Sequence, residues 1–585
     1  MLPEFFENMP RFPWLGILFQ FYLFFDALAM FSKRQGPDRE EGDPAKRLKK
    51  NIDDLFLSND ISASRAATLY QDATDTGIHC FARTARVLKQ NLASSSTSNV
   101  HRNLLRRLTK YSKWPDLYVA PIRFYCPKRE EVRTVKLPFL LPHEIIRALA
   151  LSAKDEKILF SQEGLCQTSK DHMSRAMVEL GKPLVPVGLW GDGTPCNADR
   201  SQSLETFCLN FPGQTEKNAQ LRIIMTGVNK KYMAKDITTE DILAVICWSL
   251  KCLATGIMPS FDHSGNPLTG NRKKQAGSSF PAGVLCEVRA DWAWLKSTFR
   301  FPQHNEKAGI CWMCTATPQD IRSCASTASW RENRLDHFSL LQRMLDKGLR
   351  ISSLFSAPCF KSSCFLVDWL HCADLGITAD WLAGLFLYTL PKLEGHTQKH
   401  RLQTLWQQLQ SFYKENAVTA RLDMLFFSML KKNNAFPKLR AKAAESRALV
   451  PFGLQLANTY LCSTEEENTV RLATQHLFNC YELLSPRTFC AEKMASESKF
   501  FCLLYCALEQ LQPHLFHIRP KLHLWQELTQ VSRSCPSLFW TYRDEEFGGT
   551  AALLSKRRGG SNNPTATAFA LLNKFRGKRC VPALD

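Results

Sequence analysis

Between residues 184 and 290 the chain carries three short apolar runs, then a longer amphipathic run, then a fourth short apolar run. Turn residues separate the short runs, which predicts strands, whereas "TEDILAVICWSLKCLATGI" has an acidic start and predicts a helix. The predicted strands are 184–190, 205–211, 219–227 and 284–290. This order constrains the fold more than any other feature, because it requires a meander of three strands followed by a helix and a fourth strand.

A meander, a helix and a further strand form the opening topology of a ribonuclease-H-like domain, which sets one carboxylate on the first strand and another just after the fourth. Asp192 stands in "WGDGTP" after the first apolar run, and Asp291 stands in "RADWAW" after the fourth. Gly191 and Gly193 would let the backbone at Asp192 come close to a ligand. Asp-Gly is also a common turn pair, so a strand-ending turn is the alternative for this stretch.

A third acid is needed near the other two, because phosphodiester cleavage by two metal ions takes about three carboxylates converging on Mg²⁺ or Mn²⁺. Close to the end of the chain, "FWTYRDEEFGGTAALLSKRRGG" opens a predicted helix with Asp544, Glu545 and Glu546. Acids at a helix start are also favoured by the helix dipole, which is the alternative for Glu545, as a capping role is for Asp291.

From 380 to 512 the apolar residues recur at helical spacing, which predicts one inserted helical block. The predicted fold class is α/β, a ribonuclease-H-like mixed sheet with a large helical insertion and a helical N-terminal region. The expected parts are an apolar segment with a charged hinge (1–45), a helical, basic region (46–182), the first part of the catalytic domain (183–379), the insertion (380–512), and the end of the catalytic domain with a basic tail (513–585). No Walker-type Gly-Lys-Ser/Thr loop occurs, which argues against a nucleotide hydrolase.

Four blocks of the chain resemble the DDE transposases of the CACTA type and their relatives. "WGDGTP" with "LETFCLNFPG" is similar to the first-aspartate block of that family, and "RADWAWLK" with "GICWMC" is similar to its second-aspartate block. "LVDWLHCADLG" carries the Asp-x-x-His signature on Asp368 and His371, and "TYRDEEFGGT" matches the last block. The aromatic residues of "DWAW" replace the small residues that usually follow the second aspartate.

The resemblance implies an enzyme that binds transposon ends in double-stranded DNA and cuts and joins phosphodiester bonds. It places the catalytic, metal-binding acids on Asp192, Asp291 and Glu545, with Glu546 beside them where the family commonly has arginine. Asp368 and His371 are expected to form a hydrogen-bonded pair that steadies the acids. The implied cofactor is Mg²⁺ or Mn²⁺, the implied location is the nucleus, and a homo-oligomer is a further candidate. The alternative is a DNA-binding descendant that no longer cuts.

An excess of basic residues favours a polyanionic partner, because 75 Lys and Arg against 55 Asp and Glu leave a formal charge of +20. Nucleic acid is the first such partner, and an acidic membrane surface is the second. The segment "HRNLLRRLTKYSKW" offers candidate DNA contacts, although a solvated helix face is the alternative. The candidate contacts are Arg102, Arg106, Arg107 and Lys110.

The apolar run from 12 to 31 approaches membrane-spanning length, but it contains Gln20 and Asp26. A helix buried against the protein is therefore favoured, and a membrane-anchored protein of unrelated function is the weaker alternative.

The 21 cysteines are scattered through apolar segments, which predicts buried thiols in a reducing compartment. Cys311 and Cys314 have the spacing of a metal knuckle and are candidate ligands for Zn²⁺. The other ligands would come from Cys359 and Cys364 or from His304 and His371. Buried free thiols are the alternative for all of these cysteines.

Overall fold

The computed structural model describes residues 43–58, 60–78, 97–110, 112–197, 199–215, 221–303, 305–307, 309–556, 563–582 and 584. The apolar segment 12–31 and His304 lie outside the described residues.

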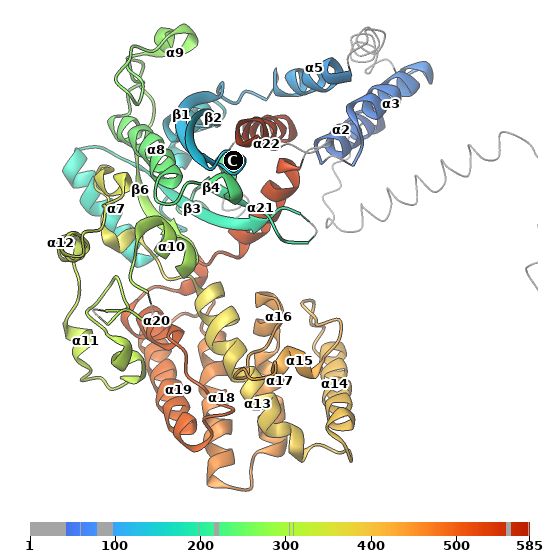
Figure 1. Ribbon diagram of the computed structural model, residues 1–585, viewed down its shortest axis with the longest axis vertical. Helices are drawn as coiled ribbons and strands as arrows, with labels where there is room; N and C mark the ends of the chain where they lie inside the picture. Colours follow the sequence, from blue (N-terminus) through green and yellow to red (C-terminus); the bar gives the residue numbers. More distant parts are fainter. Residues whose placement is uncertain are drawn as a thin grey trace, which may run out of the picture.

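A four-stranded mixed sheet forms the centre of the upper part of the molecule (Figure 1). Its strands, in the spatial order β5-β4-β3-β6, are β3 (Val185–Pro195), β4 (Ser203–Asn210), β5 (Arg222–Asn229) and β6 (Gly283–Arg289). β3, β4 and β5 are antiparallel neighbours, and β6 runs parallel to β3 after the crossover through α8 (Thr238–Thr255). The four predicted strands therefore share one sheet, as expected.

The strands lack an alternating pattern because helices cover both faces of the sheet. All residues of β5 and β6 are buried, and so is β3 up to Gly191. Strands buried on both faces appear in a sequence as continuous apolar runs rather than as alternating ones. This explains why short apolar runs were the signal for this sheet.

The region 46–182 is not wholly helical, which corrects the prediction. It contains an antiparallel hairpin of β1 (Tyr118–Cys126) and β2 (Glu131–Phe139). The burial of β1 alternates along the strand, a period of two that the sequence already contained. The backbone N–H of Leu140 donates to the carbonyl of Met225 at 2.9 Å, so the end of the hairpin adjoins β5 of the main sheet.

The remaining elements of this region are helices. The first three pack around a small core of their own that includes Phe56, Tyr70 and Leu104. They are α2 (Pro44–Leu57), α3 (Ala63–Asp75) and α5 (Thr97–Lys110), and α6 (Pro142–Ala150) and α7 (Gln167–Leu180) follow the hairpin.

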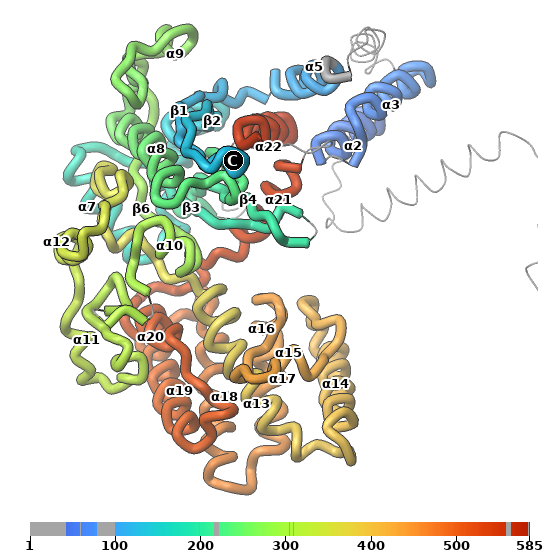
Figure 2. The backbone as a smooth tube through the Cα atoms, viewed as in Figure 1, coloured from blue at the N-terminus to red at the C-terminus, as the bar shows by residue number. Residues whose placement is uncertain are grey.

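The insertion is helical as predicted and forms the lower part of the molecule (Figures 1 and 2). Its helices are α13 (Thr378–Thr389), α14 (Gln398–Glu415), α15 (Phe427–Leu430), α16 (Ala443–Ala448), α17 (Val450–Tyr460), α18 (Glu465–Glu482) and α19 (Ala491–Leu511). The helical stretch Leu370–Lys392 is long and apolar enough to cross a membrane, but 83% of its apolar 18-residue part is buried inside the protein. It is the core helix of this part.

After the insertion the chain returns to the sheet (Figure 2). α20 (Lys521–Gln526) lies beside the insertion, α21 (Tyr542–Ser555) packs on β3, and α22 (Pro564–Lys578) packs on β5 and β2. Before the insertion, the chain that follows β6 forms α10 (Trp292–Phe299), α11 (Ser329–Glu332) and α12 (His337–Asp346). The short helix α9 (Gly270–Gln275) projects from the connection between α8 and β6 (Figure 1).

Candidate functional site

Asp192 lies within β3 and not in a turn. The strand continues to Pro195, past the predicted end at residue 190, and Asp192 pairs with Thr206 of β4. Gly191 is needed for packing, because a Cβ there would meet the indole of Trp294 on α10 at 2.0 Å. Gly191 therefore lets α10 approach β3 closely, and the stretch is part of the strand and not the strand-ending turn that was the alternative.

The carboxylate of Asp192 is on the face of β3 that α21 covers. Side chains alternate along a strand, so Trp190, Asp192 and Thr194 share one face. A Cβ at Gly548 of α21 would meet Thr194 at 2.7 Å and Trp190 at 2.8 Å. This glycine therefore lets the helix that carries Glu545 lie directly on the strand that carries Asp192.

Asp291 follows β6 and caps α10. Its Oδ1 accepts a hydrogen bond of 2.6 Å from the backbone N–H of Trp294, so the capping role that was an alternative for Asp291 is present. A carboxylate has several acceptor positions, and one capping bond leaves it able to bind a cation as well. Since β6 is the parallel neighbour of β3, Asp291 lies at the same end of the sheet as Asp192.

Glu545 lies in the first turn of α21, where the predicted helix begins. Its Oε1 is 3.7 Å from Nε2 of His371. Glu546 is exposed, so the structure places Glu545 and not Glu546 with the other acids.

Asp368 and His371 form the hydrogen-bonded pair that was predicted. Nδ1 of His371 lies 2.7 Å from Oδ2 of Asp368, and the backbone N–H of His371 donates to the same oxygen at 2.9 Å. The other carboxylate oxygen of Asp368 accepts a bond of 2.8 Å from the backbone N–H of Thr541, which directly precedes α21. Asp368 thus fixes both the imidazole and the start of the helix that carries Glu545.

The charges of these residues act on one another. Burial, and after it the charge of Asp291, raises the pKa of Asp192. Burial and the charge of Asp192 raise the pKa of Glu545 to about 8. Burial alone would lower the pKa of His371, but the hydrogen bond to Asp368, together with the charges of Asp368, Glu545 and Asp291, raises it to about 9. The three acids and the imidazole therefore form one electrostatic cluster, which we call the acid cluster.

A second buried network holds the residue next to Glu545. The carboxylate of Asp544 accepts hydrogen bonds from the Arg222 guanidinium on β5 and, at 3.4 Å, from the amide of Asn210 on β4. Arg289 on β6 lies 3.9 Å from Asp544 and 2.6 Å from Glu287. The side chains of both arginines and both acids are at most 5% exposed. Three strands therefore fix the position of α21 through Asp544.

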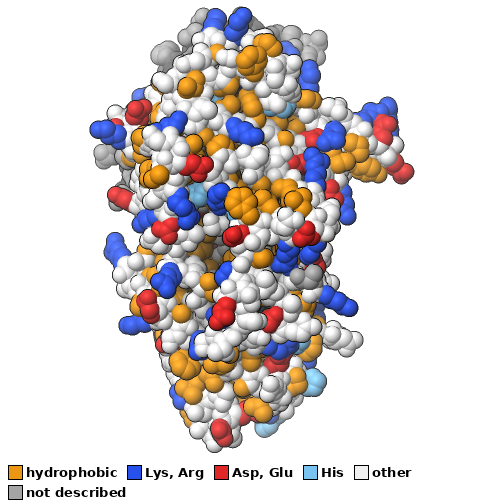
Figure 3. Space-filling model, turned by 90° about the vertical axis from the view of Figure 1, so that its left-hand side faces the viewer, with side chains coloured by type: hydrophobic (Ala, Val, Ile, Leu, Met, Phe, Trp, Pro, Cys, Tyr) orange, Lys and Arg blue, Asp and Glu red, His pale blue; other side chains and the backbone are white. Residues whose placement is uncertain are grey.

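The candidate DNA contacts lie on α5, away from the acid cluster (Figure 1). Arg102, Arg106 and Lys110 are exposed and spaced four residues apart, so they follow one face of the helix, and Arg107 is half-buried. Basic side chains are also spread over the side of the molecule drawn in Figure 3, with apolar patches and a hollow between them.

Cys311 and Cys314 lie in a buried group with His523 and Glu527, and this group could hold a metal ion. One ligand atom from each residue lies within 4.8 Å of all the others. Sγ of Cys314 is 3.3 Å from Nε2 of His523, and Sγ of Cys311 is 3.8 Å from Oε1 of Glu527. Within the described parts of the chain, no other set of three or more Cys, His, Asp and Glu side chains is gathered as closely, the acid cluster included.

Two of these four residues are deprotonated at neutral pH, and the other two would release a proton on binding a metal ion. Burial would lower the pKa of His523, but Cys314 and Glu527 raise it to about 9, and burial raises the pKa of the Cys311 thiol. The hydrogen bond with Cys311 and the nearby His523 lower the pKa of Cys314 to about 6. Burial would raise the pKa of Glu527, but His523 and Arg334 lower it to about 2, and Arg334 donates to both of its oxygens at 2.7 and 2.9 Å. A thiolate and a carboxylate are therefore ready to bind a cation.

The partners of the cysteine pair differ from those predicted. Cys364 lies against His172 instead, 3.7 Å from its Nδ1, and His371 belongs to the acid cluster. The signal that was missed is the pair His523 and Glu527, four residues apart on one helical turn, which puts both side chains on one face. The described cysteines form no disulfides, and most of them are buried.

A comparison with protein-family models finds no match for the chain, and a search of curated proteins finds no similar protein.

Proposed function

We propose that this chain is a DDE-type transposase, or a transposon-derived relative, that binds double-stranded DNA in the nucleus and cuts and joins phosphodiester bonds. The observation that carries the proposal is the meeting of Asp192, Asp291 and Glu545 around His371, since these acids come from three distant parts of the chain. A ribonuclease-H-like fold is part of the proposal, and the strand order β5-β4-β3-β6 supports it.

Asp192, Asp291 and Glu545 offer the hard oxygen donors that Mg²⁺ and Mn²⁺ prefer. Burial and, after it, the repulsion between these acids raise the pKa values of Asp192 and Glu545, and bound cations would relieve that repulsion. When bound, such ions activate the attacking oxygen and stabilise the leaving oxygen.

The chain's own residues prepare this site. The sheet holds Asp192, the helix cap holds Asp291, and the buried network around Asp544 holds the turn that carries Glu545. His371 is protonated at neutral pH, because its pKa is about 9, and so it balances part of the negative charge of the acids.

We further propose that Cys311, Cys314, His523 and Glu527 hold Zn²⁺. Two sulfur atoms, one imidazole nitrogen and one carboxylate oxygen form a four-ligand set of the kind that binds zinc in structural sites. Such an ion would tie the segment after α10 to α20, and its role would be structural.

The test is DNA cutting by the full-length chain in Mg²⁺ or Mn²⁺, measured as nicking of a labelled plasmid. Asp192→Asn keeps the size of the side chain but removes its charge, so cutting should fall by orders of magnitude while DNA binding persists. Asp199→Asn changes an exposed aspartate in the β3–β4 connection and should cut normally. Normal cutting by Asp192→Asn would refute the catalytic role of the acid cluster.

A DNA-binding descendant that no longer cuts is the second candidate. Two observations favour it. Glu545 lies 3.7 Å from His371 and so pairs with a side chain instead of facing only the other acids. The carboxylate oxygens of Asp192, Asp291 and Glu545 are not all within 4.8 Å of one another, as the ligand atoms of the cysteine group are. Binding without any cutting by the unmodified chain would establish this candidate.

DNA binding itself is tested by charge reversal on α5. Because basic residues displace condensed counterions from the phosphates, binding should weaken steeply with salt. Reversing Arg102, Arg106 and Lys110 together should lower the affinity and flatten the salt dependence. The same reversal of three exposed lysines on the insertion, Lys399, Lys414 and Lys493, is the matched control. Equal losses in both variants would show that only net charge matters.

A further inference from the structure

A cavity of about 330 Å³ lies directly beside the acid cluster. It is lined by the end of β6 and the first turns of α10, by the segment 366–372, and by α20. Asp291 and His371 belong both to the lining and to the acid cluster, and Asp368, which is bonded to His371, also lines the cavity. Whatever enters the cavity therefore lies next to the proposed cutting site.

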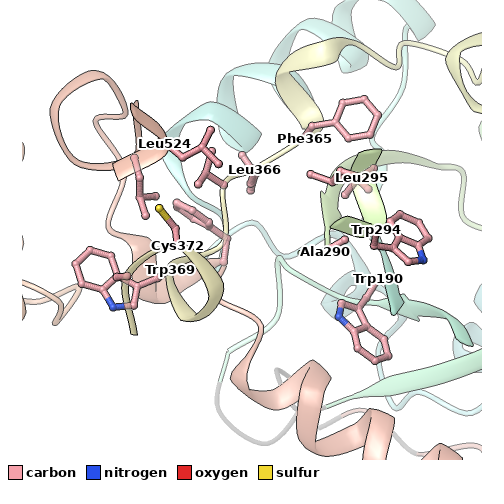
Figure 4. Close-up of a cluster of buried hydrophobic side chains, with 14 of the residues drawn as sticks. Trp190, Ala290, Trp294, Leu295, Phe365, Leu366, Trp369, Cys372 and Leu524 are labelled. Carbon is pink, nitrogen blue, oxygen red and sulfur yellow. The ribbon is translucent and has the colours of Figure 1, made fainter. Parts of the chain in front are cut away.

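The walls of the cavity are mostly apolar. Figure 4 shows Ala290 and Leu295 on one side of this space and Leu366, Cys372 and Leu524 on the other. Two indoles add flat surfaces: Trp312 is buried and stacks on Phe301, and Trp292 is half-buried and directly follows Asp291 in the chain.

A few polar groups stand among these walls. Lys296, Gln303 and Lys521 line the cavity, and the ammonium of Lys521 donates to the backbone carbonyl of His371. An apolar cavity with a few placed polar groups is the usual form of a site for a small molecule, and the volume is at the lower end of the roughly 300–1,000 Å³ of such sites.

We infer that this cavity receives one unstacked nucleobase of the DNA that the acid cluster cuts, held against the indole of Trp292. The inference rests on the proposed function. A base is the part of DNA that suits apolar and aromatic walls, because the phosphates and sugars are charged or polar. The cavity has room for one base but not for a duplex.

The position of Trp292 gives this site a physical purpose. A base that leaves the stack loses its neighbours, and an aromatic side chain replaces that stacking without regard to sequence. Removing one base from the stack also frees the adjoining backbone to approach Asp291.

The inference is tested with two short duplexes and the full-length chain in Ca²⁺. One duplex carries a single unpaired 2-aminopurine nucleotide, and the other carries an abasic nucleotide at the same place. The unmodified protein should bind the first roughly tenfold more tightly than the second, and the fluorescence of 2-aminopurine should fall on binding.

Trp292→Ala should bind the two duplexes equally, with the affinity for the abasic duplex unchanged, and Trp292→Phe should keep most of the preference. Trp406→Ala, which removes a half-buried indole from the insertion, should behave like the unmodified protein.

Three results would overturn the inference. Equal binding of both duplexes by a protein that still cuts DNA would exclude the base site and leave the proposed function intact. A preference that survives in Trp292→Ala would place the base elsewhere. Failure to bind either duplex would refute the proposed function and the base site together.

Discussion

Nε2 of His371 lies 3.7 Å from Oε1 of Glu545, although the whole helical insertion separates the two residues in the chain. Nδ1 of the same ring is bonded to Asp368, whose other oxygen accepts from the backbone of Thr541 at the start of α21. The two segments that flank the insertion are therefore joined by one imidazole and one carboxylate, beside the sheet that carries the other acids. A helical block can be inserted here because these contacts close the chain on the sheet again.

We expect Asp368→Asn to impair cutting. Thr541 and His371 donate to different oxygens of the carboxylate, and in asparagine an NH₂ group, which donates, replaces one of these acceptors. The imidazole loses its anionic partner and α21 loses a fixed start, so metal-dependent cutting should fall roughly tenfold to a hundredfold. The measurement is a titration of plasmid nicking with Mg²⁺.

The control for this prediction is Asp336→Asn. Asp336 caps α12 with a bond to the backbone of Ser339 and is exposed, so its amide should leave the cutting rate unchanged. An Asp368→Asn variant that cuts like the unmodified protein would show that the pair with His371 does not support the site.

We expect Arg222→Met to destabilise the fold strongly. The arginine and Asp544 are both buried, and removing one partner leaves an uncompensated charge, which costs about 3–5 kcal/mol. The free energy of unfolding, measured in urea, should fall by that amount. Arg289 on β6 lies 3.9 Å from Asp544 and would still compensate part of its charge, so the loss should be at the lower end of this range.

Two further variants separate burial from charge. Arg123→Met breaks a pair with Asp241 in which the arginine is 47% exposed, and it should cost no more than about 1 kcal/mol. Combining Arg222→Met with Asp544→Leu should restore part of the lost stability, because no unpaired charge remains. A double variant less stable than Arg222→Met would refute this account.

The sheet could be predicted from the sequence, because its strands are short apolar runs in an order that allows few folds. Asp192 and Asp291 could be proposed because each follows an apolar run, and Glu545 because it opens a predicted helix. The contacts of Trp294 with Gly191 and of Arg222 with Asp544 could not be predicted. They join residues far apart in the chain, and the spacing of residues along a sequence carries no information about such pairs.

The partners of Cys311 and Cys314 could not be predicted for the same reason. The Cys311 and Cys314 pair was visible as a local spacing, but its partners are more than 200 positions further along the chain. Histidines and cysteines nearer in the sequence were therefore preferred to His523 and Glu527. The β1–β2 hairpin was a different case, since the alternating pattern of β1 was present in the sequence although the whole region 46–182 was interpreted as helical.

We expect the purified chain to contain about one zinc ion, held by the cysteine group. Cys314→Ser should lose this ion, because a hydroxyl is a far weaker ligand than a thiolate, and thermal stability should fall with it. Metal content by mass spectrometry and unfolding temperature are the measurements. Cys364→Ser changes a buried thiol outside the group and should keep the ion. Equal zinc content in both variants would exclude this site.

The last prediction concerns the pH dependence of stability and Asp374, a buried residue of the π-helical turn η8 (Leu370–Ile377). Its two oxygens accept hydrogen bonds of 2.6 Å from Tyr481 and Tyr542. Burial raises the pKa of Asp374 to about 7, against the lowering effects of the two tyrosines and Arg447, and the charge of Asp368 adds to the increase.

An acid whose pKa is higher in the folded chain than in the unfolded chain binds more protons when folded, so stability falls as the pH rises between the two values. The unfolded value is about 4, so the contribution of Asp374 should be fully present below about pH 4 and be lost by about pH 7. The free energy of unfolding of the unmodified protein, minus that of Asp374→Asn, should therefore decrease by a few kcal/mol over roughly this range. Urea unfolding at a series of pH values measures the difference.

Asp423→Asn, at an exposed position of the insertion, should give a difference that does not change with pH in this way. A difference for Asp374→Asn that is constant from pH 4 to pH 7, or that increases, would show that this carboxylate is already ionised in the folded protein, and the two tyrosines would then be donors to a buried anion.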